Sequence, residues 1–373
     1  MKKLFFIAAI AGAALVSCTK NELAPSATEQ HEITFASPVV GVQTKVLGAI
    51  GTEYKTGESF EVWSVYNTVD ISAWGGTTYF SDVTAQYNRD ADGWGLNPKY
   101  FWPANGKLSF VALSPAMTNT TTYTAANGFT IQSWSQGSSE GAIVDLMYSE
   151  PTFNQERADF ANDENDDDDD DVANGEHKYN GVDIKFKHAL SYLVFNIKTK
   201  ENYAPQTQFQ LESITLSGIY TTGTFTQKGT PAEGKTWDPW AELTTGEKGT
   251  YIAYNENDAT KRLPFNSTAV DVPETTGKEI ILLPQALTAD QQKITIKYDI
   301  RTDFMEEDEW ITQTQTVDLT NTTVTEWEMG KKYTYTITIG MDEILFDPAV
   351  SDWDADINGD GEVDKDDESN ITL

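Results

Sequence analysis

The chain has 373 residues, with 58 acidic against 26 basic side chains and a formal net charge of −32 at pH 7. This charge argues against partners such as nucleic acid or an anionic lipid surface, because both would be repelled, and it is compatible with cations. Cys18 is the only cysteine in the sequence, so disulfide bonds cannot stabilise the fold. The length suggests about two domains, each held by its own buried apolar core.

The N-terminus has the features of an export signal. Two lysines precede an uncharged run from Leu4 to Val16, which is shorter than the roughly 20 residues of a membrane-spanning helix. The four residues ending at Cys18, Leu-Val-Ser-Cys, resemble the lipobox of bacterial lipoproteins, in which the signal is cut before an acylated cysteine. We expect residues 1–17 to be a signal peptide, Cys18 to carry lipid, and 18–31 to be a polar tether. A chance cysteine after an ordinary signal is the alternative.

The body of the chain predicts β-strands separated by Gly, Asn, Pro and Asp clusters. Several segments alternate apolar and polar residues, as half-buried strands do, and no window of a dozen residues shows a helical stripe. We expect an all-β protein built from β-sandwiches. The segments that favour strands are 60–66, 108–113, 182–187, 190–198, 211–218, 279–284, 293–300, 311–319 and 331–340.

An acidic run divides the sequence near its middle. Asp166 to Asp171 are six consecutive aspartates, which repel one another and cannot pack in a core. We interpret the run as an exposed loop, flexible or cation-collecting, that marks a boundary. The predicted domains are therefore 32–172 and 173–353, followed by an acidic tail at 354–373.

Several strings, in this order, resemble the fimbrillin-like family of bacterial surface lipoproteins and pilus subunits. They are HEITFAS (31–37), FEVWSVY (60–66), KYFWPANGKLSFVALSP (99–115), DLMYS (145–149), IKFKHALSYLVFNIKT (184–199), IILLPQ (280–285) and GKKYTYTITIG with FDPAVSDW (330–353). The resemblance implies two tandem transthyretin-like β-sandwich domains. It also implies a subunit of a fimbrium, or a related surface adhesin, on the outer membrane with a role in cell adhesion. The residues themselves give little indication of a catalytic site, so no enzymatic activity is expected.

The resemblance further implies how such a subunit assembles. A trypsin-like protease removes the first strand, and a strand from a neighbouring pilin subunit fills the groove by β-augmentation. Lys45 stands where the family's cleavage site falls, although one basic residue is equally compatible with an ordinary surface lysine. The chain departs from the polymerising pattern after Trp353, because an acidic tail replaces an apolar donor strand. A tip or accessory subunit is therefore expected rather than a stalk subunit.

The tail contains a calcium-type loop. The spacing in DINGDGEVDKDD (356–367) offers oxygen ligands at alternate positions around a glycine turn, which is what Ca²⁺ requires, and it resembles one repeat of a dockerin. A disordered acidic tail is the alternative. The predicted ligands are Asp356, Asn358, Asp360, Glu362, Asp364 and Asp367.

Other motifs carry less weight. The string GTPAEGKT (229–236) has the spacing of a phosphate-binding loop, but the proline at 239 disfavours the helix that such a loop needs, so we interpret it as a hairpin loop. The three histidines form no close pair, and His188 is expected to be structural. Trp237 and Trp240 are candidates for a glycan-binding platform, although tryptophans in β-sandwiches are more often part of the core. The alternative function is accordingly a stand-alone surface module that binds glycan or a host protein.

Overall fold

The described residues of a computed structural model are 31–36, 38–40, 58–88, 93–117, 121–124, 128–137, 143–156, 181–227, 239–241, 243, 246–273, 280–306, 309–321, 323–340 and 344–352. Within them the chain forms β-strands, with a 3-10 turn at Leu319–Asn321 and no α-helix. This confirms the predicted all-β class. In the same ranges there is no helix with the length and apolarity needed to cross a bilayer.

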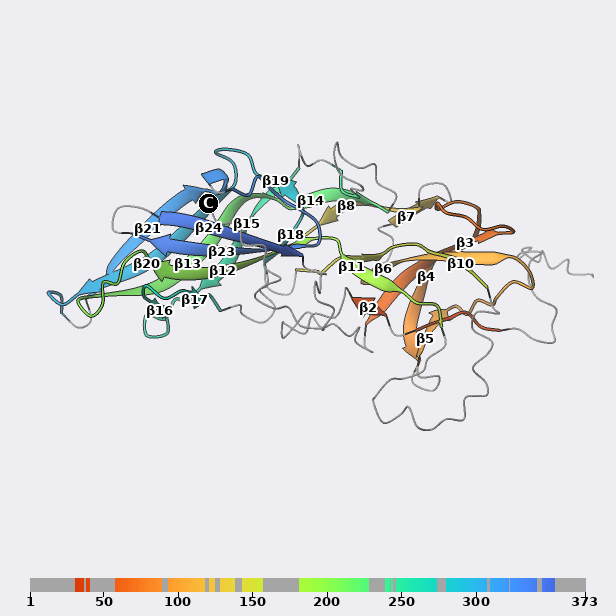
Figure 1. The fold of residues 1–373 in the computed structure, drawn as a ribbon, viewed down its shortest axis with the longest axis horizontal. Helices are drawn as coiled ribbons and strands as arrows, with labels where there is room; N and C mark the ends of the chain where they lie inside the picture. The colour runs from red at the N-terminus through yellow and green to blue at the C-terminus, as the bar shows by residue number, and fades with distance from the viewer. Residues whose placement is uncertain are drawn as a thin grey trace, which may run out of the picture.

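A nine-stranded sheet occupies the first half of the molecule (Figure 1). Its strands are, in order, β1 (Thr34–Phe35), β5 (Gly93–Asn97), β4 (Thr77–Asn88), β3 (Ser59–Asn67), β6 (Lys107–Ser114), β9 (Met147–Ser149), β11 (Lys185–His188) and β2 (Val39–Val40), with β10 (Thr152–Gln155) also paired to β6. Both β1 and β2 belong to the segment 31–40. The sheet therefore closes on itself through this segment.

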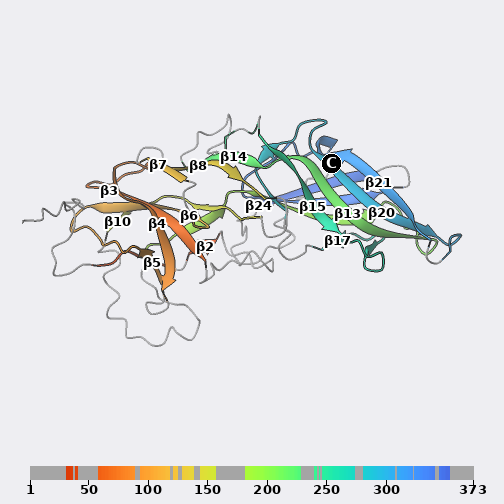
Figure 2. The ribbon, with the colours of Figure 1, turned by 180° about the vertical axis from the view of Figure 1, so that it is seen from behind.

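Two five-stranded sheets form a sandwich in the second half. One contains β17 (Val270–Asp271), β12 (Ser191–Thr199), β23 (Lys331–Ile339) and β24 (Ile344–Asp352), with β18 (Ile280–Leu282) paired to β12. The other contains β15 (Lys248–Asn255), β13 (Thr207–Tyr220), β20 (Lys293–Thr302) and β21 (Ile311–Asp318), which lie side by side in Figure 2, with β16 (Leu263–Phe265) paired to β13.

The core of this sandwich follows the predicted alternation. Ile294, Ile296 and Tyr298 of β20 are buried, as are the alternate residues Tyr333, Tyr335, Ile337 and Ile339 of β23. Every second residue of each strand thus points between the sheets, where its burial stabilises the fold by about 1.5–3 kcal/mol per large side chain.

The two halves share a second core. β14 (Thr222–Thr226) follows β13 in the chain but pairs with β8 (Gly128–Ser135), which also pairs with β7 (Thr121–Thr124). A further small sheet pairs β19 (Gln285–Ala286) with β22 (Glu326–Trp327). Across the junction, the Gln136 side-chain amide donates to the Ile281 carbonyl at 2.9 Å, and the Trp240 indole N–H donates to the Ala189 carbonyl at 2.6 Å. The halves are therefore joined by backbone pairing as well as apolar packing.

The predicted domain boundaries remain predictions. The acidic run that suggested a division lies outside the described residues. β11, which comes after that run in the chain, still pairs with β9 of the first sheet. The chain thus belongs to the nine-stranded sheet as far as His188, and β12 of the second sandwich begins at Ser191.

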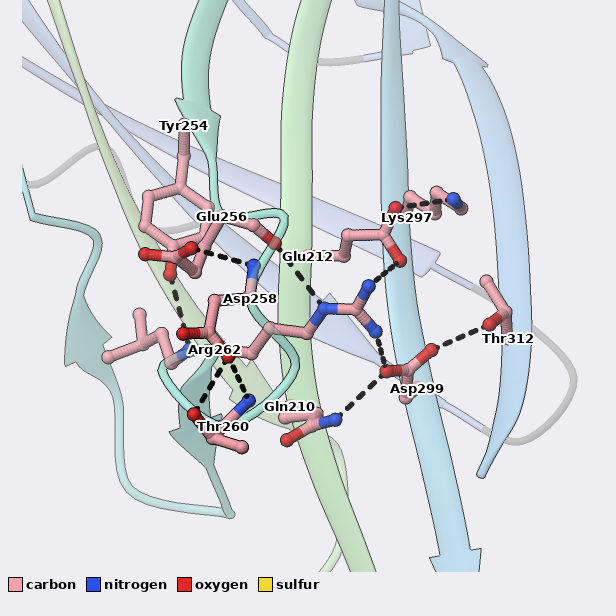
Figure 3. A network of polar contacts seen from close by, with 11 residues as sticks. Gln210, Glu212, Tyr254, Glu256, Asp258, Thr260, Arg262, Lys297, Asp299 and Thr312 are labelled. Atoms are coloured by element: carbon pink, nitrogen blue, oxygen red, sulfur yellow. Dashed lines mark hydrogen bonds and ion pairs between the residues drawn. The ribbon is translucent and has the colours of Figure 1, made fainter. Parts of the chain in front are cut away.

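A network of largely buried ionic side chains lies on the outer face of the second sandwich (Figure 3). Arg262 bridges Glu212 of β13, at 2.6 Å, and Asp299 of β20, whose side chain is 1% exposed. Asp299 also accepts hydrogen bonds from Gln210 at 2.9 Å and from Thr312 of β21 at 2.8 Å. Burial raises the pKa of Asp299, but these hydrogen bonds and the Arg262 charge outweigh it and hold that pKa below its ordinary value. The network thereby ties three adjacent strands together.

Candidate assembly site

The segment 31–40 lies between two parts of the sheet that are distant in sequence. On one side the Ile33 amide donates to the Tyr100 carbonyl at 2.8 Å, and β1 pairs antiparallel with β5. On the other side the Ala36 amide donates to the Val182 carbonyl at 3.1 Å, and β2 pairs in parallel with β11. This short segment therefore provides hydrogen-bond partners for the backbone of β5 on one side and of the chain leading into β11 on the other. Without it, both would be unpaired sheet edges.

The side chains of the segment are part of the first core. Ile33 and Phe35 are fully buried and Val40 is 7% exposed. The Phe35 ring meets the rings of Phe60 at 5.8 Å and Phe110 at 5.7 Å, both in edge-to-face geometry. Burial of three such side chains stabilises the closed sheet by about 5–9 kcal/mol, before the aromatic contacts are counted. Without the segment, the apolar interior of the sheet would face solvent.

Gly181 allows the segment 31–40 to come close to the chain at 181–182, which leads into β11. A Cβ at this position would lie 2.4 Å from the carbonyl carbon of Phe35 and 2.6 Å from the Ala36 amide nitrogen. These are backbone atoms, so they cannot move aside as a flexible side chain would. The close contact between 31–40 and the chain at 181–182 therefore requires glycine.

A surface ion pair also fixes the start of the segment. The Lys99 ammonium contacts the Glu32 carboxylate at 2.6 Å, with the Lys99 side chain 65% exposed. Exposed pairs of this kind contribute about 0–1 kcal/mol, so the apolar burial of Phe35 and its neighbours dominates the attachment.

The predicted site residues lie outside the described residues. This applies to the lipidation site Cys18, to the processing site Lys45, and to the phosphate-loop-like string at 229–236. It applies equally to the predicted calcium ligands Asp356, Asn358, Asp360, Glu362, Asp364 and Asp367. Elsewhere, among the residues that the structure describes, no group of three or more histidine, cysteine or acidic side chains could hold a metal ion.

Two residues that the sequence singled out are described. His188 is buried, and its Nδ1 lies 2.9 Å from the Asp145 carboxylate, so it packs at the end of β11 as a structural residue. Trp240 is 6% exposed and its indole N–H bonds to the Ala189 carbonyl, so it belongs to the core between the two halves. The core interpretation is therefore confirmed for Trp240 and the glycan-platform alternative is wrong for it, while Trp237 lies outside the described ranges.

Substitution of Gly181 tests how tightly the segment is held. We expect Gly181→Ala to lower the free energy of unfolding by about 1–3 kcal/mol, because the added methyl group overlaps the Phe35 backbone. Hydrogen exchange at the Ile33 and Ala36 amides should accelerate, while amides of β13 and β20 keep their protection. Gly75→Ala is the control, since its Cβ would meet nothing within 4 Å. Unchanged exchange at Ile33 would contradict the role assigned to Gly181.

This chain is similar to solved structures and to one protein family. Comparison with curated proteins gives no match. The structure is similar to that of a fimbrial protein from Bacteroides vulgatus ATCC 8482, with a TM-score of 0.57, 15% identity, and coverage of 86% of this chain and 99% of that one. A candidate cell adhesion protein from Bacteroides uniformis ATCC 8492 gives a TM-score of 0.48, 16% identity and coverage of 88% and 99%. The sequence profile described as fimbrillin-like matches residues 44–353, and the chain therefore belongs to the fimbrillin-like family.

Proposed function

We propose that this protein is a surface lipoprotein that acts as a fimbrial subunit in cell adhesion, and that the segment 31–40 is a removable first strand. Family membership supports the pilus-type role. The observation that carries the assembly mechanism is the closure of the nine-stranded sheet by this segment. The protein has no enzymatic role in this proposal.

Removal of the segment would create a site for another strand. The Tyr100 carbonyl and the Val182 amide and carbonyl would lose their partners, and the core around Phe60 and Phe110 would open. An incoming strand with apolar residues at alternate positions would restore both sets of interactions. Its register would be fixed, because a slip of one residue would turn the apolar side chains toward solvent.

The acidic tail favours a particular position in the fibre. A stalk subunit needs a donor strand of its own, and the sequence after Trp353 is dominated by acidic residues. We therefore propose a tip or accessory subunit, which accepts a strand from a neighbouring pilin subunit and does not donate one.

Limited proteolysis tests the removable strand. Trypsin treatment of the folded protein should cut after Lys45 and detach residues 18–45, identified by mass spectrometry as the peptide 21–45 because trypsin also cuts after Lys20. Lys45→Gln should give no peptide ending at residue 45 under the same conditions, because trypsin requires a basic residue, and a cut after Lys55 would be recognised by its longer product. Retention of residues 31–45 after digestion of the parent protein would contradict strand removal and favour the alternative, a surface module for glycan or host protein that never enters a fibre.

Lipidation tests the proposed location at the outer membrane. Several acyl chains on Cys18 would anchor the protein, since each buried CH₂ contributes about 0.8 kcal/mol and one chain alone binds a membrane only marginally. Radiolabelled palmitate should be incorporated into the expressed protein and not into the Cys18→Ser variant. Equal labelling of the two proteins, or no labelling of either, would rule out this anchor.

Calcium binding by the tail is a separate proposal. The loop at 356–367 supplies several carboxylates around Gly361, and we expect a dissociation constant of about 10⁻⁴–10⁻³ M, as in extracellular calcium modules. Calorimetric titration with calcium should give a binding heat for the parent protein. The Asp360→Ala variant should bind calcium with at least tenfold lower affinity. The same heat in both proteins would exclude this loop as the site.

A further inference from the structure

The strand β21 forms one margin of the second sandwich. All eight of its residues, from Ile311 to Asp318, pair with β20 in continuous antiparallel register. No register shift interrupts this pairing, and no other strand in the described ranges pairs with the outer side of β21. The strand therefore presents a straight row of backbone donors and acceptors along the margin of the sheet.

This edge lacks the features that usually prevent strands from pairing between molecules. Proteins block such edges with charged residues, proline, bulges or very short strands. The other margins of these sheets follow that rule: β15 carries Lys248 and two register shifts against β13, β24 contains Asp347 and Pro348, and β17 has two residues. Residues 311–317, ITQTQTV, contain neither charge nor proline. β21 is thus the unguarded margin of the second sandwich as far as the structure describes it.

The sequence of the edge is complementary to itself. ITQTQTV reads the same in both directions except that isoleucine and valine exchange places at its ends. In an antiparallel pair centred on Thr314, each Thr312 would oppose Thr316 of the second copy, and each Ile311 would oppose Val317. The two glutamines would oppose each other, and Thr314 would oppose itself. Threonine pairs and β-branched apolar pairs are favourable cross-strand neighbours.

The hydrogen-bonding pattern permits this register. Outward-pointing backbone groups occur at every second residue of an edge strand. A pairing centred on a residue sets even-numbered positions against even-numbered positions and odd against odd, so outward groups meet outward groups in both copies. A pairing centred between two residues would set outward groups of one copy against inward groups of the other, and is excluded.

The exposed side chains also favour self-pairing. Ile311 is 51% exposed, although it lies opposite Ile300 of β20 on the face that continues the sandwich core. A second copy would cover it with Val317, which already packs partly against that core. Hydrogen bonds from Thr312 to Asp299 (Figure 3) and between Thr316 and Thr295 hold two of the three threonine side chains of the outer face in place. Less conformational entropy is therefore lost on association.

The Asp318 carboxylate at the end of this edge is already engaged within the chain. Asp318 accepts hydrogen bonds from the Thr320 amide and hydroxyl at 2.9 and 2.6 Å, and from the Asp290 amide. Hydrogen bonding, chiefly from the Thr320 hydroxyl, lowers the pKa of Asp318, so it stays charged near neutral pH at the end of the strand and not within the pairing. The net charge of −32 repels two copies, and added salt should screen this repulsion.

We propose that β21 is a self-recognition edge, at which two copies of this chain pair antiparallel about a twofold axis at Thr314 and join their outer sheets into one. Such an interface is isologous, because the same surface serves both partners. A single strand pair buries less than the roughly 1,200 Å² of stable interfaces, so we expect a dissociation constant on the order of 0.1–1 mM. The inference is independent of the removable first strand, which lies in the other half of the molecule.

Disulfide trapping tests both the contact and its register. In a Cys18→Ser background of the full chain, at about 1 mM in detergent, Thr314→Cys should form a covalent dimer under mild oxidation, because opposed antiparallel residues have Cα atoms about 4.5–5.5 Å apart. Thr312→Cys and Thr316→Cys should each give little dimer alone and a covalent heterodimer when mixed. Thr250→Cys, on the exposed face of β15, is the control for random collision. Cross-linking of Thr314→Cys at the rate of Thr250→Cys would overturn the proposal.

A charge at the axis provides the complementary test. Thr314→Lys should weaken association at least tenfold, because two ammonium groups would then face each other across the twofold axis. Thr250→Lys should leave it unchanged, and both side chains are exposed, so neither change should disturb the fold. Sedimentation velocity at about 1 mM protein, in low and high salt, measures the dimer fraction. A monomeric parent chain under both conditions, or a dimer that Thr314→Lys does not weaken, would refute the self-recognition edge.

Discussion

The closure of the nine-stranded sheet by the segment 31–40 is the constraint on which the first half of the molecule depends. The segment pairs with β5 on one side and β11 on the other, and it places Phe35 against Phe60 and Phe110. Backbone pairing and apolar burial are therefore gained or lost together. A segment that is short and near the start of the chain can be detached without threading other strands, but the gap that it leaves cannot remain empty in water. Replacement by an equivalent strand is the stable outcome.

The junction between the halves lies on the other face of the same sheet. In β6, Phe110 and Ala112 point into the closed first core, whereas Val111 and Leu113 point into the core shared with β14 and β18. Strand exchange at the segment would thus change the packing on one face of β6 and leave the contacts on the other face in place. Because β14 pairs directly with β8, the second sandwich would keep its orientation relative to the first sheet. Such a joint can transmit tension along a fibre through a backbone ladder instead of a flexible linker.

The sequence predicted the strands in which apolar and polar residues alternate regularly. It did not predict strands in which this alternation is interrupted. Tyr333 to Ile339 were predictable because every second residue is apolar. β4, with TTYFSDVTAQYN, was not, because a bulge at Asp82 interrupts the alternation. The closed sheet could not be predicted either, since the parallel pairing of β2 with β11 joins residues that are distant in the chain. The burial of Glu61 could not be predicted from the sequence either. Its side chain is 4% exposed, and this burial, together with the nearby Asp82, raises the pKa of Glu61 to about 7.

Both proposed interaction sites, the segment 31–40 and the strand β21, lie at edges of β-sheets. In the first half, one segment covers two edges at once, and its removal would expose both edges to an incoming strand. In the second half, β15, β24 and β17 carry bulges, charges, proline or short length, so they resist accidental pairing. β21 has none of these blocking features, but its alternating threonines and glutamines offer little apolar surface to an arbitrary strand. What distinguishes a copy of β21 from other strands is the near-palindrome, which matches threonine to threonine and isoleucine to valine only for the same sequence in the opposite direction. Specificity of that kind comes from register and not from strength, which is why a weak contact can still be selective when many copies are held on one surface.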